Sequence, residues 1–334
     1  MRIEKGGSAC RILSIVGLCG EFPVPLVRLL DGYYDYNRRV VTQLTREGYL
    51  LEWKFTYARR VIRSLRLSAS GKTALYNANR RGWNLINAGL LSPPDANGSV
   101  EKAIRLHRNA ACFVMSTMGA KAKLSFDLQE PDRRDGPVYF SAYMIRKLSG
   151  ADSKGSRASG VITSAGRYYI LYAPLSRNMR WSASAEDTFL SWVSTLFPNH
   201  VFSGRVFLAD RWELAERILA HSADRFTRLI RLRPDSRDYL LAIDSHGAAL
   251  LRAIVDEAAF IRLFARCRDY GMEEPGELYA PLFELNAWSA FCGKQVCLPL
   301  RDPFCFDFQQ SAVEQLNKYD RPCRVLPGAV LENL

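Results

Sequence analysis

The sequence predicts a mixed α/β (α+β) protein with two domains, and three observations lead to this prediction. The chain has 334 residues, more than a single hydrophobic core usually organises. Hydrophobic residues make up 48% of it and charged residues 24%, a composition that favours packed cores over disorder. Segments with helical apolar spacing alternate with short apolar runs of strand length. Because residues 92–99 are dense in turn formers, we expect a first domain over 1–91, this linker, and an α/β domain over 100–334.

The composition also indicates the compartment. No apolar run reaches the ~18 residues of a membrane-spanning helix, and the first residues lack the features of a signal peptide. The eight cysteines are too sparse for a disulfide framework in a chain of this length. We therefore predict a cytoplasmic protein with free thiols and no membrane association.

Positive charge is concentrated in one segment. The formal net charge is +12, and the stretch from Arg38 to Arg81 contains eleven Lys and Arg residues against two Glu. A local excess of this kind attracts a polyanion such as DNA, RNA or an acidic membrane surface. The alternative is a solvated basic face that has no partner.

The order of elements around this segment is typical of a DNA-binding motif. Residues 9–19 have helical apolar spacing that stops at Gly20, and residues 23–30 predict a short second helix. A third helix is expected with Asp35 as its N-cap and Gly48 just beyond its end.

The third helix is expected to have two different faces. Val41 and Leu44 are three residues apart, so they share a face that can pack on the first two helices. The other side carries residue types that bind phosphates and base edges. These residues are Arg38, Arg39, Thr42, Gln43 and Arg46.

Two alternating runs, 50–57 and 61–67, predict a β-hairpin whose connection contains Arg59 and Arg60. Another helix is expected from Ser68 towards Asn87. Three helices followed by a basic hairpin form the plan of a winged helix-turn-helix, in which the third helix enters the major groove and the hairpin lies along the backbone. The predicted DNA-binding residues are Arg38, Arg39, Thr42, Gln43 and Arg46 on the helix, and Lys54, Arg59, Arg60 and Arg63 on the hairpin.

A resemblance supports this plan. The sequence Glu47-Gly48-Tyr49-Leu50, the hairpin, and the sequence Leu67-Ser68-Ala69-Ser70-Gly71 resemble bacterial winged-helix proteins. In those proteins a recognition helix ends in Gly and two apolar residues, and the wing returns into a Leu-Thr-x-x-Gly helix start, where this chain has Ser68. The wider layout is similar to the replication-relaxation family of plasmids and conjugative elements. The resemblance implies a double-stranded DNA-binding protein that acts in replication, conjugative transfer or transcription control of a mobile element.

The second domain is expected to have a mixed sheet, because residues 158–163 and 168–172 predict a hairpin among the α/β alternation. A degenerate restriction-endonuclease-like fold is one form of such a domain. Active nucleases of that kind need acidic residues on adjacent strands to bind Mg²⁺ and activate water. Neither strand of this hairpin has an acidic residue. We therefore predict that the domain binds a protein partner or a second copy of the chain, without catalysis.

No cofactor or metal is expected. The sequence Gly71-Lys72-Thr73 imitates the end of a phosphate-binding loop, but Arg66 stands where the motif requires its first Gly. Residues 244–247 predict a turn and a helix cap, and the C-terminal cysteines, spaced C-x4-C-x7-C-x17-C, lack the tight pairs of a zinc site. Two alternatives to DNA binding without catalysis stay open. One is a DNA-processing enzyme (a nuclease or relaxase accessory) with a different active site, and the other is a winged helix used only for protein contacts.

Overall fold

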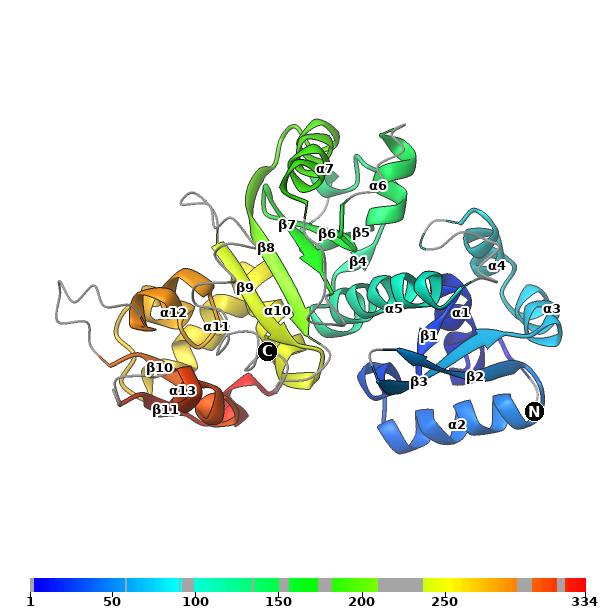
Figure 1. Cartoon of the computed structure of the whole chain (residues 1–334), viewed down its shortest axis with the longest axis horizontal. Helices are drawn as coiled ribbons and strands as arrows, with labels where there is room; N and C mark the ends of the chain where they lie inside the picture. Colours follow the sequence, from blue (N-terminus) through cyan, green and yellow to red (C-terminus); the bar gives the residue numbers. More distant parts are fainter. Residues whose placement is uncertain are drawn as a thin grey trace. The chain divides into compact units, whose positions relative to one another are not determined.

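The fold is mixed α/β, as the sequence predicts. The computed structural model describes residues 3–57, 59–89, 91, 99–133, 135–149, 156–173, 182–209, 237–292, 302–316 and 322–334. The chain divides into two compact units (Figure 1). The first consists of Met1–Val114 with Phe140–Asp152, and the second of Met115–Tyr139 with Ser153–Leu334.

The first unit combines helices with a three-stranded antiparallel sheet of order β1-β3-β2. In Figure 1 the hairpin β2–β3 lies between α2 and α5, and both helices contact this sheet. The predicted first helix, the short second helix and both hairpin strands are confirmed. The elements are α1 (Ser8–Cys19), β1 (Phe22–Pro23), the 3-10 helix η1 (Val24–Leu29), α2 (Tyr34–Arg46), β2 (Leu50–Tyr57), β3 (Arg60–Leu67), α3 (Ala69–Ala78), α4 (Arg80–Asn87), α5 (Val100–Val114) and α6 (Ala142–Leu148).

Helix α2 ends as predicted but begins differently. Gly48 follows its end with a φ of 77°, and the amide of Tyr49 donates a hydrogen bond to the carbonyl of Leu44 at 2.9 Å, a typical helix termination. The N-cap, however, is Tyr33, and Asp35 lies in the first turn. A carboxylate in the first turn also favours the helix, because it faces the positive end of the helix dipole. Asp35 therefore marks the helix start without capping it.

The helix expected from Ser68 to Asn87 is two helices. Ser68 caps α3 by accepting a hydrogen bond from the amide of Gly71 at 2.9 Å. Asn79 then interrupts the helix and caps α4 by accepting a hydrogen bond from the amide of Gly82 at 3.0 Å. Asparagine side chains compete for backbone hydrogen bonds in this way, so a new helix axis begins at this residue.

Helix α5 belongs to the first unit, although the expected boundary placed it in the second domain. Its apolar residues, such as Ile104, Leu106 and Ala110, are buried, and the helix contacts α1, β1 and η1. An amphipathic helix joins whichever core covers its apolar face, and here that core is the N-terminal one. Residues 92–98 of the predicted linker lie outside the described residues.

A six-stranded sheet of order β4-β5-β6-β7-β8-β9 belongs to the second unit, except for the last two residues of β5, which the division assigns to the first. The β6–β7 pair is antiparallel, whereas β4–β5, β7–β8 and β8–β9 are parallel, so the sheet is mixed as predicted. Helix α7 contacts β7 through a hydrogen bond of 2.7 Å between the hydroxyl groups of Tyr168 and Ser194. The strands are β4 (Lys123–Leu124), β5 (Val138–Ser141), β6 (Gly160–Ser164), β7 (Arg167–Tyr172), β8 (Val201–Ala209) and β9 (Arg237–Ala242), and a separate parallel pair consists of β10 (Phe304–Phe306) and β11 (Arg324–Leu326).

Helices lie before, between and after the strands of this unit along the chain. Helix α10 contacts β6 and β9, and α12 contacts β9. The sequence also predicts a helix at 212–220 and strands at 226–232 and 296–300, and these residues lie outside the described ones. The helical elements are the π-helix η2 (Met115–Gly119), η3 (Pro131–Arg133), α7 (Ala183–Leu196), α10 (Ser245–Val255), α11 (Glu257–Arg268), η4 (Pro275–Tyr279), α12 (Leu285–Cys292), η5 (Asp307–Gln309), α13 (Gln310–Leu316) and η6 (Gly328–Leu331).

Candidate nucleic-acid interface

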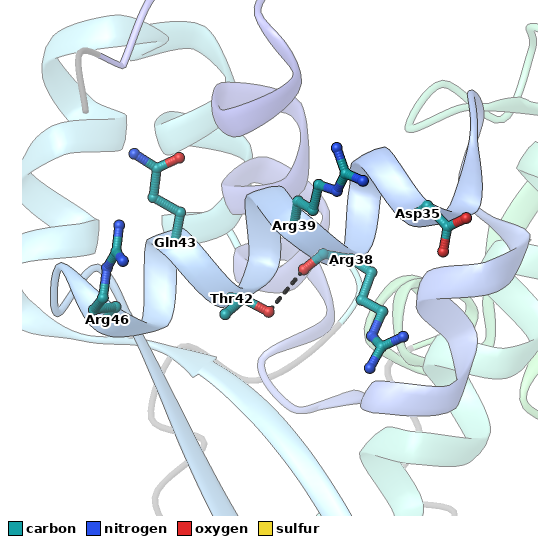
Figure 2. A pocket seen from close by; sticks show the side chains of 6 residues that line it. All are labelled: Asp35, Arg38, Arg39, Thr42, Gln43 and Arg46. Atoms are coloured by element: carbon teal, nitrogen blue, oxygen red, sulfur yellow. Dashed lines mark hydrogen bonds between the residues drawn. The ribbon is translucent and has the colours of Figure 1, made fainter.

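The solvent face of α2 brings the predicted helix residues together. Its buried face consists of Asn37, Val40, Val41 and Leu44, which confirms the expected inward position of Val41 and Leu44. The helical period places six other side chains on the opposite side. They line an open concavity of about 450 Å³, which Figure 2 shows along the helix. The lining residues are Asp35, Arg38, Arg39, Thr42, Gln43 and Arg46.

Two arginines of this face can contact a ligand directly. Arg38 and Arg39 are exposed and project to either side of the helix axis (Figure 2). Within the described residues, neither of these two guanidinium groups has a hydrogen bond or ion pair. Thr42 donates a hydrogen bond to the carbonyl of Arg38 at 3.0 Å, and the amide of Gln43 donates to Glu47 at 2.9 Å. A ligand can therefore bind the two guanidinium groups directly, whereas the side chains of Thr42 and Gln43 already donate hydrogen bonds within the protein.

The hairpin presents its basic residues in two ways. Arg59 lies in the turn with a φ of 63° and is exposed, as are Arg60 and Lys54. Arg63 is also partly exposed, and it donates two hydrogen bonds to the Glu52 carboxylate, at 2.6 and 3.0 Å. These bonds lower the pKa of Glu52 and raise the pKa of Arg63. The charge of Arg63 therefore already has a partner across the strands, and its contact with DNA stays a prediction.

A buried polar network, which no local sequence pattern indicates, holds the base of the hairpin. The Ser64 hydroxyl donates to a Glu21 oxygen at 2.6 Å and lies 2.8 Å from Nε2 of His107. Trp53 donates its indole N–H to the same Glu21 oxygen at 2.8 Å. Burial lowers the pKa of His107 to about 4, so the imidazole is neutral at pH 7. Since the hydroxyl donates to Glu21, Nε2 carries the proton that reaches Ser64, and the network joins both strands to α5.

A few charged groups of the second unit are buried and hydrogen-bonded. Arg205 on β8 binds Asp238 on β9 with hydrogen bonds of 2.9 and 2.5 Å, and the Asp238 side chain is fully buried. Although burial alone lowers the pKa of Arg205, the bonds and charge of Asp238 raise it. Glu186 accepts a bond from the Tyr172 hydroxyl at 2.8 Å, and burial together with this carboxylate raises the pKa of Tyr172 well above its usual value.

The other sequence motifs have structural roles in the described residues. Asp244 caps α10 by accepting a hydrogen bond from the amide of Gly247 at 2.8 Å, which confirms the predicted turn and cap. A Cβ atom at Gly71 would lie 2.1 Å from the carbonyl oxygen of Tyr49, so this glycine is explained by helix packing. Thr73 donates to the carbonyl of Ala69 in its own helix.

Two further features are absent from the described part of the chain. There, no group of three or more His, Cys, Asp or Glu residues has an arrangement that could hold a metal ion. Cys297 of the C-terminal cysteine set lies outside it. Nor does this part contain a helix with the length and apolar character needed to span a membrane.

Comparisons of the chain with protein-family models, with curated proteins and with solved structures find no match. What the α2 face and the hairpin bind is therefore inferred from their own residues. Those residues combine exposed guanidinium groups, side-chain amide and hydroxyl groups, and a basic turn, all on one unit.

Proposed function

We propose that the protein binds double-stranded DNA without catalysis and that its first unit is a winged helix-turn-helix. One observation is central. The side chains of Arg38, Arg39, Thr42, Gln43 and Arg46 line one solvent face of α2, opposite its buried face. The element order α1, β1, η1, α2, β2, β3 and the sheet order β1-β3-β2 support the same proposal.

In the proposed complex, α2 lies in the major groove, which is about 12 Å wide and admits an α-helix. Arginine can bind guanine with two hydrogen bonds, and glutamine can bind adenine in the same way. Arg59 and Arg60 at the hairpin turn, with Lys54 on its exposed surface, would contact phosphates. The positive excess between Arg38 and Arg81 would provide the part of the affinity that does not depend on sequence.

The second unit is proposed to bind a protein partner or a second copy of the chain. A role in replication, conjugative transfer or transcription control of a mobile element is part of the proposal, and it rests on the resemblance of the N-terminal sequence and layout. An active site of unrecognised kind in the second unit would instead make the protein a DNA-processing enzyme.

The test is fluorescence anisotropy of a labelled random-sequence duplex at several salt concentrations. We expect binding that weakens steeply with salt, with a log–log slope of about −0.9 for each phosphate neutralised. The variants Arg39→Ala and Arg59→Ala should each weaken binding, and the slope should become shallower by about one for each phosphate that a variant no longer neutralises. Arg262→Ala is the matched control, because Arg262 is an exposed arginine on α11 of the second unit.

The outcomes separate the parts of the proposal. If well-folded Arg39→Ala and Arg262→Ala proteins bind DNA alike, α2 is not the DNA-binding helix. If Arg59→Ala alone matches the control, Arg59 makes no contact with DNA. Absence of binding at low salt would contradict the proposal as a whole and favour a first unit used for protein contacts.

A further inference from the structure

Three exposed tyrosines lie at the N-terminal end of α2. The exposed fractions are 88% for Tyr33, 49% for Tyr34 and 54% for Tyr36. Within the described residues, none of these three side chains has a hydrogen bond or ring contact. Single exposed aromatic residues are common, but a cluster of them is a typical feature of binding surfaces. These three residues, here called the tyrosine cluster, are therefore candidates for ligand contact.

The tyrosine cluster is continuous with the basic face of α2. Tyr36 precedes Arg39 by three residues and Gln43 by seven, so helical spacing places it at one edge of that face. Tyr34 precedes Arg38 by four residues and lies at the other edge. Each edge of the helix thus combines an aromatic ring with an exposed guanidinium group.

We infer that the tyrosine cluster stacks on unpaired bases, so that the preferred ligand is a duplex with an adjacent single-stranded segment, such as a fork. This inference rests on the proposed function. Aromatic side chains beside phosphate-binding arginines are the combination that binds single strands, because every base has a face on which a ring can stack. Inside a duplex those faces are covered by neighbouring base pairs. A ring then has a stacking partner only where a strand leaves the duplex.

The position of the cluster fits this ligand. In helix-turn-helix proteins the N-terminal residues of the recognition helix contact base edges. Tyr33, Tyr34 and Tyr36 occupy that end of α2, so they would meet the first unpaired bases of a strand that separates there. An apolar protein partner fits less well, because it would remove Arg38 and Arg39 from water without compensating their charge.

The experiment compares two DNA ligands with the same paired sequence, one fully paired and one continued into two single-stranded arms. Four proteins are measured by anisotropy with the full chain: wild type, Tyr33→Ala/Tyr36→Ala, Tyr33→Phe/Tyr36→Phe, and Tyr270→Ala. Tyr270 is 49% exposed in the second unit and serves as the matched control. We expect wild type to bind the fork more tightly by roughly five-fold or more for each base stacked.

The alanine variant should lose this preference, so that its affinities for the fork and for the paired duplex become equal. The phenylalanine variant and Tyr270→Ala should retain the preference, because the rings of the cluster are still present. A 2-aminopurine placed at the first unpaired position should change its fluorescence when wild type binds and change less with the alanine variant.

Several outcomes would overturn the inference. Equal affinity of wild type for both ligands would do so, as would a fork preference that the alanine variant keeps. If Arg39→Ala still weakens duplex binding in either case, the proposed function stands and only the role of the tyrosines fails. If neither ligand is bound, both proposals fail. Loss of self-association in the alanine variant, with unchanged DNA preference, would assign the cluster to protein contacts.

Discussion

The arginines on the exposed face of α2 and in the sheet of the second unit differ in exposure and in pairing. Arg38 and Arg39 are exposed, and within the described residues their guanidinium groups have no hydrogen bond or ion pair. Arg205 is buried and bound to Asp238. Burying a charge removes its hydration, so a buried charge must be paired inside the fold. An exposed charge stays hydrated and can pair with a ligand instead. Substitutions in the sheet should therefore change stability, and substitutions on α2 should change binding.

The largest effect should come from breaking the buried pair. Asp238→Ala leaves the guanidinium of Arg205 buried without its carboxylate, and we expect a loss of about 3–5 kcal/mol in the free energy of unfolding. Urea unfolding followed by tryptophan fluorescence measures it, because the buried Trp288 lies in the second unit. The matched comparison is Arg39→Ala, which should change stability by no more than about 0.5 kcal/mol.

The double variant Arg205→Met/Asp238→Leu sharpens this test. Because it removes both charges and keeps apolar volume, it should be much closer to wild type than Asp238→Ala is. A loss below about 1 kcal/mol for Asp238→Ala would contradict the view that Arg205 depends on this carboxylate. In proteins that remain folded, the salt dependence of DNA binding should be the same as in wild type.

A somewhat smaller effect should appear as a pH dependence of the first unit. His107 has a pKa of about 4 in the folded protein, against 6.5 for an ordinary histidine, because it is buried. The unfolded chain therefore binds more protons between these values, and stability rises with pH across that window. The contribution is fully present above pH 6.5 and is lost as pH falls towards 4, on the order of 3 kcal/mol in total.

Unfolding free energies measured from pH 7 to pH 4 for wild type and His107→Gln isolate this contribution. A glutamine amide can still donate to Ser64 but does not titrate, so the variant should lose less stability over the window. The carboxylates with lowered pKa, such as Glu52 and Glu277, titrate in both proteins and cancel in the difference. Identical pH profiles would show that His107 is not responsible.

Local sequence signals predict α2 and the hairpin. The spacing of Val41 and Leu44 and the glycine at 48 each act within one element, and each matches the structure. The run 50–57 forms the predicted strand, but its two buried residues, Leu50 and Phe55, lie on opposite faces. The five helix residues of the candidate site follow from the same period. The tyrosines are visible in the sequence, but their exposure depends on which side of the helix start is packed.

Pairs of distant residues are not predictable in this way. Glu21 and Ser64 are 43 residues apart, and Arg205 and Asp238 are 33 apart, so no local pattern pairs them. The apolar face of α5 is visible, but its spacing does not say which core it joins. Helix α11 is not predicted, because Asp256 also fits the end of the preceding helix. In the structure Asp256 caps α11, by accepting hydrogen bonds from the amides of residues 258 and 259.

The smallest expected effect compares two arginines within the hairpin. Arg59 is exposed in the turn, whereas Arg63 already binds Glu52, so Arg63→Ala should weaken DNA binding less than Arg59→Ala does. Because the Arg63–Glu52 pair is partly exposed, its loss should cost less than about 1 kcal/mol of stability. Glu52→Gln should strengthen DNA binding, since it removes a negative charge and releases Arg63. Anisotropy at one salt concentration measures all three variants against Arg262→Ala. Equal losses of DNA affinity for Arg59→Ala and Arg63→Ala would mean that Arg63 leaves Glu52 to contact DNA. The ion pair would then make no difference to how the arginines of this hairpin bind DNA.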